Sequence, residues 1–311
     1  MTTDPHATEP RGPHAAAPDL TAPDLGADVP ATVTLTGTGV AGVEMPRIGL
    51  GTWRLAGEEG ADAVHAALAA GYRHVDTAEN YGNEDAVGLA AARALAEGVL
   101  TRDELFLTTK LNREHHGGPE RVRPAVEASL RRLGVDHADL VLIHWPNPEQ
   151  DRYVETAAAL AGLVETGLIR AWGVSNFTAE HLDRLAEAGL RAPVDQIQVD
   201  PVAAIPGWQA AVRAHGAVVT AYSPIGRAEL GIETREAITA AVARTGRTVQ
   251  QVVLRWHLQH GRVVIPKSAD PARQAENLDL LSFSLTPAEM AGIDALDDGS
   301  GPRQHPETFG H

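Results

Sequence analysis

The chain has 311 residues, of which 43% are hydrophobic, and a formal net charge of −15. This length and composition permit one large domain or two ordinary ones, with a sizeable core. The negative charge argues against a general binder of nucleic acid or acidic membranes, because such a surface repels phosphate.

No cysteine is present, which excludes disulfides and thiolate chemistry. The N-terminus lacks the basic start and apolar core of a secretory signal peptide. No apolar run approaches the roughly 18 residues of a membrane span. We therefore expect a soluble, cytoplasmic protein with no nucleic-acid or membrane partner.

Residues 1–30 are rich in Ala, Pro, Asp and His and show no apolar period, which predicts a disordered tail. The pattern changes at residue 31. Val33 and Leu35 alternate with threonines, residues 37–39 contain two glycines, and an apolar run returns at residues 43–45. This pattern predicts a short β-hairpin. We expect residues 31–311 to form a single domain.

Strand-like apolar runs then alternate with helical patterns over the rest of the chain. The runs are Arg47–Gly51, Arg73–Asp76, Leu105–Lys110, Asp139–His144, Ile169–Val174, Val194–Val199, Ala217–Ala221 and Arg262–Ile265. Eight strands alternating with helices over about 250 residues favour an α/β fold, a (β/α)8 TIM barrel.

Helix signals support this reading. One apolar face is formed by Val122, Val126, Leu130 and Leu133, and another by Val249, Val252, Val253 and Trp256. Thr178 and Thr248 are predicted N-caps. A capping box with proline in its first turn, residues 286–289, predicts an extra C-terminal helix.

A doubly wound sheet is the main alternative to the barrel. A doubly wound sheet is expected to carry the glycine-rich motif of a dinucleotide-binding loop after an early strand. The segment Gly49–Trp53 lacks the third glycine of that motif and leads into no immediate helix. The segment therefore does not form a Rossmann phosphate loop.

Polar residues stand at the ends of three successive predicted strands. Asp76, Lys110 and His144 end these strands, and Tyr81 follows Asp76 by five residues. Barrel active sites are built at the carboxyl ends of the strands. Singly, each residue also suits a structural role as a cap, a surface aromatic or a buried histidine. Together they predict one site.

This set of residues suits general acid catalysis at a carbonyl oxygen. Tyrosine has a pKa of about 10, and a nearby ammonium lowers it. A lowering by about two units requires roughly 2.7 kcal/mol. We expect Lys110, held by Asp76, to lower the pKa of Tyr81, and His144 to hold the carbonyl oxygen. A nucleophile or a hydride would then add to the carbonyl carbon.

Lys110 and Lys267 are the only lysines among 26 lysines and arginines. The lysine ammonium is a compact charge whose pKa its surroundings can shift, whereas the arginine guanidinium is planar and stays charged. Each lysine is therefore a candidate for chemistry that requires an ammonium. An aldolase or isomerase with a Schiff base on Lys110 remains a further interpretation, although Asp76 should keep the amine protonated.

Six motifs extend the pattern from about residue 31 to the end of the chain. They are Gly71–Glu84, Phe106–Leu111, Asp139–Pro146, Trp172–Phe177, Ala221–Gly226 and Ile265–Leu278. In their order and spacing the sequence resembles the aldo-keto reductases, most closely the bacterial branch with 2,5-diketo-gluconate and methylglyoxal reductases.

The resemblance implies NADPH-dependent reduction of aldehydes or ketones to alcohols, with NADH as a weaker cofactor. A non-catalytic NADP(H)-binding regulatory or sensor protein on the same fold is the alternative. The resemblance also implies a monomer that takes a small carbonyl substrate and needs no metal. Paired histidines at residues 115–116 and 257–260 lack an obvious third ligand.

The resemblance also implies the role of each site residue. Tyr81 is the acid, Lys110 and Asp76 tune it, and His144 orients the substrate. The residues implied to bind the cofactor are Ser175, Asn176, Gln196, Tyr222, Ser223, Lys267, Ser268, Arg273, Glu276 and Asn277. Lys267, Ser268 and Arg273 suit a 2′-phosphate, because arginine can bind two of its oxygens.

The sequence departs from the family's pattern at several places. Asp195 and Asp200 stand in the strand-six segment, where we expect them to add charge near the pocket. Residues 202–207 and 227–233 look shortened, and loops of this kind set specificity. Trp53 and Trp145 are expected to form apolar walls of the substrate pocket.

Overall fold

The computed structural model describes residues 28–226, 231–298 and 304–310. The predicted tail, residues 1–30, lies almost wholly outside the described residues, so its boundary stays a prediction. Val29, near the end of that segment, is buried with Leu254, Leu258 and Leu280.

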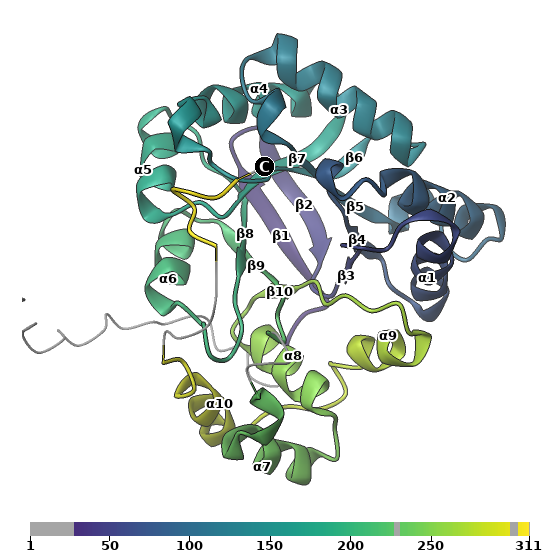
Figure 1. The fold of residues 1–311 in the computed structure, drawn as a ribbon, viewed down its shortest axis with the longest axis vertical. Coiled ribbons are helices and arrows are strands. Elements are labelled where there is room, and N and C mark those ends of the chain that lie inside the picture. Colours follow the sequence, from purple (N-terminus) through teal and green to yellow (C-terminus); the bar gives the residue numbers. More distant parts are fainter. Residues whose placement is uncertain (1–27, 227–230, 299–303, 311) are drawn as a thin grey trace, which may run out of the picture.

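Eight parallel strands form one sheet with helices around it (Figure 1). The strands are β3 (Leu50–Gly51), β4 (His74–Asp76), β5 (Phe106–Leu111), β6 (Ala138–Ile143), β7 (Ile169–Ser175), β8 (Val194–Gln198), β9 (Val218–Tyr222) and β10 (Val263–Val264). They are paired in chain order from β3 to β10.

The helices are α1 (Gly57–Ala70), α2 (Glu84–Ala96), α3 (Pro119–Leu133), α4 (Tyr153–Glu165), α5 (Ala179–Glu187), α6 (Pro206–Ala214), α7 (Glu236–Thr245), α8 (Val249–Gln259), α9 (Pro271–Leu278) and α10 (Pro287–Asp294). Helices cover the outer face of the sheet and side chains fill the barrel interior, so both faces are buried and each strand reads as a continuous apolar run. For this reason each predicted strand has a counterpart in the structure, although β3 and β10 are shorter than the predicted Arg47–Gly51 and Arg262–Ile265.

The sheet closes where the first strand meets the last. The backbone N–H of Gly49 donates to the Val264 carbonyl at 2.8 Å, and the N–H of Gly51 donates to the Pro266 carbonyl at 3.0 Å. Ile48 also forms a parallel bridge with Val264. These contacts close the predicted (β/α)8 barrel.

Glycine is required at this seam because the two backbones approach closely. A Cβ atom at Gly51 would lie 2.8 Å from the Ile265 carbonyl oxygen, closer than side chains tolerate. The seam places the residues after β3 beside those after β10. Trp53 and Lys267 consequently line one cavity, which is described below.

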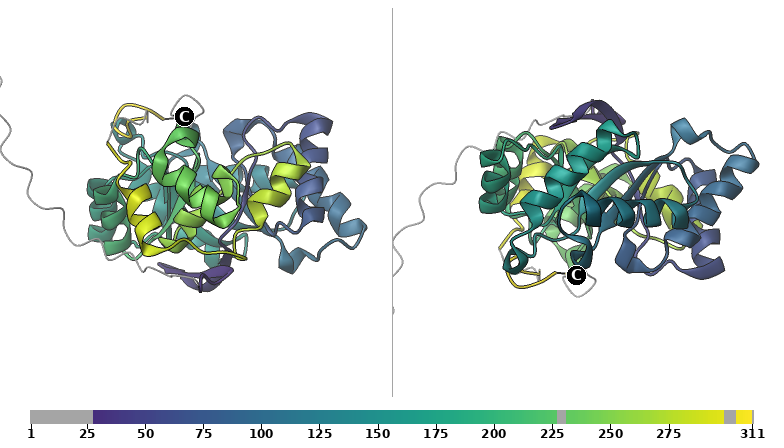
Figure 2. Two further views of the ribbon diagram at one scale, coloured as in Figure 1. Left: turned by 90° about the horizontal axis from the view of Figure 1, so that it is seen from below. Right: turned by 90° about the horizontal axis from the view of Figure 1, so that it is seen from above.

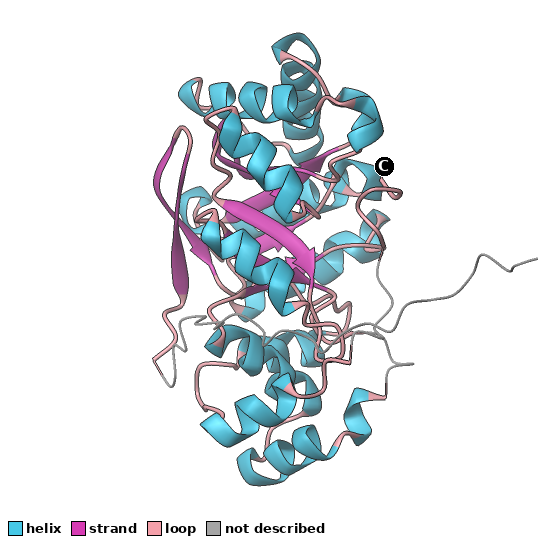
Figure 3. Cartoon of the chain, turned by 90° about the vertical axis from the view of Figure 1, so that its left-hand side faces the viewer, coloured by secondary structure: helices cyan, strands magenta, loops and turns pink. Residues whose placement is uncertain are grey.

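The predicted hairpin lies across the amino-terminal end of the barrel. It consists of β1 (Thr32–Gly37) and β2 (Val40–Pro46), which pair antiparallel. Leu35 and Met45 are fully buried, and the Trp172 indole N–H donates to the Thr38 carbonyl at 2.8 Å. The hairpin and residues 304–310 lie at opposite ends of the barrel (Figures 2 and 3).

The helix signals in the sequence are confirmed. Residues 122, 126, 130 and 133 are buried on α3, and Thr178, Thr248 and Thr286 are N-caps. The predicted extra helix is α10, which packs against α7. Helix α7, between β9 and α8, is a second helix outside the strand–helix alternation of the barrel. The sequence patterns did not predict it.

The described residues include no helix with the length and apolarity that a transmembrane span requires.

We predict that Gly51→Ala lowers the free energy of unfolding by about 1–3 kcal/mol, because the added methyl group pushes β3 away from β10. Denaturation in urea measures the change. Gly162→Ala is the matched control. No atom lies within 4 Å of a Cβ atom built at that helical position, so alanine should gain up to about 1 kcal/mol there. Equal effects at the two positions would contradict the role given to the seam.

Candidate active site

Three strand ends bring the four predicted catalytic residues together at the carboxyl end of the barrel. The Lys110 ammonium lies 2.5 Å from Asp76 Oδ1 and 2.9 Å from the Thr77 carbonyl oxygen. It lies 3.5 Å from the Tyr81 hydroxyl. The Tyr81 and His144 rings meet edge to face with centroids 5.9 Å apart. The four side chains therefore form one cluster.

A short 3-10 turn, Glu79–Tyr81, aims the tyrosine at the lysine. Gly82 ends this turn with φ near 63°, a left-handed conformation that favours glycine. The Glu79 carboxylate accepts from the Asn112 N–H at 3.2 Å, which ties the turn to the end of β5. The tyrosine is thus held by both of the strands that carry its partners.

Asn83 supports this turn through hydrogen bonds, a role that the sequence did not predict. It is fully buried. Its amide donates to the Thr52 and Leu55 carbonyls at 2.8 and 2.7 Å, and its oxygen accepts from the Thr77 hydroxyl. Asn83 therefore joins the loop after β3 to the loop after β4. An asparagine just before a helix reads as a cap, so its sequence position does not reveal this role.

Lys110 is held in its charged form. Burial is the largest single influence on this residue and acts to lower its pKa. Asp76 acts in the opposite direction through its charge and its hydrogen bond, and the Tyr81 hydroxyl adds a second hydrogen bond, so the pKa of Lys110 is raised above its ordinary value. The lysine is therefore an ammonium at neutral pH, not the free amine that would attack a carbonyl.

The expected lowering of the pKa of Tyr81 is wrong as a net effect. Burial raises the pKa of Tyr81 above its ordinary value, and Lys110 acts in the opposite direction but offsets only part of this. Asp76 neutralises much of the lysine charge and also favours the neutral phenol. Tyr81 is therefore a protonated phenol at neutral pH, with a cation beside its oxygen.

The residues expected to hold a cofactor ring form a hydrogen-bonded group beside this cluster. Asn176, at the end of β7, donates to the His144 carbonyl at 3.2 Å and accepts from the Tyr222 hydroxyl at 3.0 Å. Its backbone has φ near 64°. The Ser175 hydroxyl donates to the Gln196 carbonyl at 2.7 Å. Strands β7, β8 and β9 are thus cross-linked at their ends.

Gln196 joins this group to the cluster around Lys110. Its side-chain amide donates to Asp76 Oδ2 at 2.7 Å, while Asp76 Oδ1 holds Lys110. Both oxygens of a carboxylate that is only 2% exposed therefore have a partner. This arrangement meets the requirement that a buried charge be both paired and hydrogen-bonded.

A cavity of about 650 Å³ opens over these residues. Of the predicted site residues, it is lined by Asp76, Tyr81, His144, Ser175, Asn176, Gln196, Tyr222, Ser223, Lys267, Trp53 and Trp145. Lys110 lies beneath the lining, 1% exposed. Trp145 is buried, whereas Trp53 is 56% exposed at the rim.

Sequence analysis missed several residues of the cavity wall. Asn80 and Gln198 line the cavity, as do Gln304 and Phe309 near the C-terminus. No strand or helix pattern leads to the C-terminal pair, because their segment reaches the cavity from beyond the last helix.

The predicted phosphate-binding residues follow Lys267 around the start of α9. Ser268 is largely buried, and its hydroxyl accepts from the Asp270 N–H at 3.0 Å. Arg273 and Glu276 are exposed on α9, while Asn277 is buried. Within the described part of the chain, neither Lys267 nor Arg273 makes an ion pair. Their charges are available to an anion.

Asp195 and Asp200 do not line the cavity, although Asp195 accepts from the backbone of Asn176, which does. Asp195 is fully buried on β8 and accepts from the Phe177 N–H at 3.4 Å. Asp200 accepts from the Val202 N–H at 3.1 Å in the turn after β8. Burial raises the pKa of both carboxyl groups, that of Asp195 strongly, which favours their neutral forms.

The histidines at residues 257 and 260 have structural partners. His257 bonds to the Pro224 carbonyl oxygen at 2.8 Å, and His260 lies 2.8 Å from Asp294. Among residues 28–226, 231–298 and 304–310, no group of three or more His, Asp or Glu side chains is placed to hold a metal ion.

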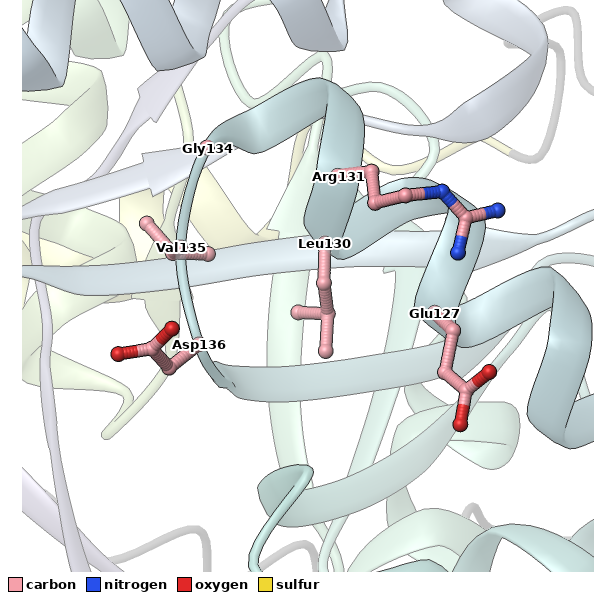
Figure 4. Close-up of a pocket in the computed structure, with 6 residues that line it drawn as sticks. All are labelled: Glu127, Leu130, Arg131, Gly134, Val135 and Asp136. Atoms are coloured by element: carbon pink, nitrogen blue, oxygen red, sulfur yellow. The ribbon is translucent and has the colours of Figure 1, made fainter.

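A second hollow, of about 350 Å³, lies beside the C-terminal end of α3 (Figure 4). It is lined by Glu127, Leu130, Arg131, Gly134, Val135 and Asp136. These residues lead into the start of β6, at the opposite end of the barrel from Tyr81. The hollow contains none of the predicted site residues.

The sequence matches known proteins over most of its length. The sequence model of the Aldo/keto reductase family matches residues 47–298. An aldo-keto reductase of Mycolicibacterium vanbaalenii is 45% identical over 266 residues, which cover 85% of this chain and 93% of that protein. The methylglyoxal reductase DkgA of Yersinia pestis is 41% identical over 270 residues, 86% of this chain and 94% of that protein.

A solved structure has the same fold. The crystal structure of a Bombyx mori aldo-keto reductase in complex with NADP superimposes with a TM-score of 0.77 at 34% identity. The match covers 86% of this chain and 94% of that one.

We predict that Lys110→Met lowers the free energy of unfolding by about 3–5 kcal/mol at pH 7, because it leaves the Asp76 charge buried without its partner. The double variant with Asp76→Asn should recover part of the loss. Urea denaturation measures both. Lys267→Met is the matched control; its side chain is exposed, so it should change stability by less than about 0.5 kcal/mol. Similar losses at the two lysines would contradict a buried ion pair.

Proposed function

Because the chain belongs to the aldo/keto reductase family, we propose that it reduces aldehyde or ketone carbonyls to alcohols with NADPH, with Tyr81 as the general acid. The observation that carries this proposal is the position of the Tyr81 hydroxyl, 3.5 Å from a buried ammonium and at the wall of the cavity.

The relatives support the reaction and the cofactor. One is a methylglyoxal reductase that is 41% identical to this chain. The Bombyx mori structure is a complex with NADP, and a related aldo-keto reductase was solved with NADPH at 33% identity and a TM-score of 0.78. We infer the same cofactor here.

The residues of the cavity fit a nicotinamide nucleotide. Ser175, Asn176 and Gln196 offer side-chain oxygens and amides to a carboxamide, and the Tyr222 ring offers an apolar face beside them. Lys267 stands on the same wall with no ion pair in the described chain. An ammonium and the nearby guanidinium of Arg273 suit a phosphate, to which arginine can bind through two N–H groups.

When bound, the reduced nicotinamide supplies the hydride that adds to the carbonyl carbon. Charge then develops on the carbonyl oxygen, and Tyr81 donates its proton to that oxygen. The raised pKa of Tyr81 keeps this proton in place at neutral pH. Lys110 stabilises the phenolate that remains, because a neighbouring opposite charge favours the charged form.

His144 has a separate role in the proposal. Its ring meets that of Tyr81 edge to face and lines the same cavity. An imidazole there can hold the carbonyl oxygen near the phenol, so the acid and the reacting atom are aligned before the reaction. Its backbone carbonyl accepts from Asn176, which ties substrate and cofactor residues together.

The proposal expects Tyr81→Phe to lose about 10²- to 10⁴-fold in kcat for carbonyl reduction, the usual contribution of a general acid. NADPH affinity, measured by fluorescence titration, should stay nearly unchanged because the hydroxyl faces the substrate. Consumption of NADPH with a panel of aldehydes and ketones measures the rate.

Full activity of the Tyr81→Phe variant would remove Tyr81 as the acid. Tight NADPH binding by the unaltered protein with no turnover of any carbonyl would instead favour the regulatory or sensor function.

The preference for NADPH makes a second prediction. Arg273→Ala should raise the KM for NADPH about ten- to hundredfold, since a hydrogen bond to a charged group contributes about 1.5–3 kcal/mol. The KM for NADH should change less than about twofold. Arg93→Ala, which removes an exposed guanidinium on α2, is the control and should affect neither cofactor. Equal effects of Arg273→Ala on NADPH and NADH would overturn the phosphate assignment.

A further inference from the structure

The C-terminal residues 304–310 form a turn at the cavity. The backbone N–H groups of Thr308 and Phe309 both donate to the His305 carbonyl, at 3.1 and 2.9 Å. Residues 305–309 are therefore held together as one unit. We call this unit the C-terminal turn.

One end of the C-terminal turn forms part of the cavity wall. The Phe309 ring packs edge to face on Trp145, with centroids 4.8 Å apart. Gln304 and Phe309 line the cavity together with Tyr81 and His144. The position of Phe309 consequently sets the space beside the catalytic tyrosine.

The C-terminal turn is fastened to the barrel at a different residue. Glu307 Oε1 lies 3.2 Å from His181 Nε2 on α5. Neither Glu307 nor His181 lines the cavity. This contact is the fastening, and it joins the turn to a helix of the barrel rather than to the pocket itself.

The His181 end of the fastening is rigid. The imidazole is 5% exposed and packs against the rings of Tyr153 and Phe177, with centroids 5.3 and 5.5 Å away. Its Nδ1 accepts from the Thr178 N–H at 3.1 Å, within the capping box of α5. Packing and capping thus hold the His181 ring in place independently of Glu307.

The same contacts fix which nitrogen carries the proton. Burial lowers the pKa of His181, and Glu307 opposes this effect only in part. The neutral ring has one N–H, and Nδ1 is occupied as an acceptor from Thr178. The proton is therefore on Nε2, the nitrogen that lies 3.2 Å from Glu307 Oε1.

We propose that the polar contact between His181 Nε2 and Glu307 Oε1 seats Phe309 against Trp145 and thereby sets the size of the carbonyl substrate that the pocket accepts. The proposal rests on the proposed carbonyl reduction. It makes Glu307 and His181 positioning residues for specificity, since they act through Phe309 and touch neither substrate nor the reacting atoms.

Glu307→Ala tests the proposal. Without the fastening, Phe309 leaves the wall more often, so a small aldehyde loses contact and a large one gains room. The ratio of kcat/KM for 2-naphthaldehyde to kcat/KM for methylglyoxal should rise about two- to fivefold, the size expected for a partly exposed pair. The change should lie in KM, because Tyr81 and Lys110 are untouched.

Two further variants separate the fastening from a general disturbance. Glu307→Gln keeps the length of the side chain and an oxygen that can face His181 Nε2, so it should retain the original ratio. Phe309→Ala should shift the ratio in the same direction as Glu307→Ala. The double variant Glu307→Ala with Phe309→Ala should show no additional shift, since both changes act on one side chain. Additive shifts, or no shift in Glu307→Ala, would overturn the proposal.

A measurement without turnover keeps the two proposals apart. Chymotrypsin cuts after accessible aromatic residues, so it should cleave at Phe309 faster in Glu307→Ala than in the unaltered protein or in Glu307→Gln. Equal cleavage rates in all three would overturn the fastening even if carbonyl reduction is confirmed. Absence of carbonyl turnover in the unaltered protein would overturn the proposed function, while the cleavage rates would still decide whether Glu307 seats Phe309.

Discussion

The ion pair between Lys110 and Asp76 is the constraint on which the site depends. Two charges only 1% and 2% exposed are tolerated when each polar atom around them has a partner. The ammonium donates to the Thr77 carbonyl and the Tyr81 hydroxyl, and the Gln196 amide donates to the second carboxylate oxygen. The charges thus require neighbours from β4, β5 and β8, which brings the proposed acid and the proposed cofactor residues to one place.

The site in turn depends on how the barrel is closed. Contacts across the glycine seam bring the end of β10 beside the end of β3, so that Lys267 and Trp53 share a cavity. Asn83 then fixes the loop after β3 to the turn that carries Tyr81. Backbone hydrogen bonds at the seam and one buried amide therefore connect the proposed phosphate residues to Tyr81, the proposed acid.

Much of this arrangement could be predicted from the sequence because strands buried on both faces read as apolar runs with polar ends. That signal located Asp76, Lys110 and His144. It could not reveal Phe309, which reaches the cavity from a segment without periodicity, or Asn83, which resembles a helix cap. The sequence signal also could not predict the direction of the pKa shift of Tyr81. Burial raises this pKa more than Lys110 lowers it, and burial depends on the whole fold.

The unequal exposure of the two lysines has a practical consequence. Lys110 is sealed beneath the cavity, whereas Lys267 is exposed at its wall, and the chain has no cysteine. Apart from the terminal amine, an acylating reagent meets a single reactive side chain in the folded protein. One dye or cross-linker can therefore be attached selectively to the Lys267 amine. A nucleotide phosphate bound at the proposed site would protect this amine from the reagent.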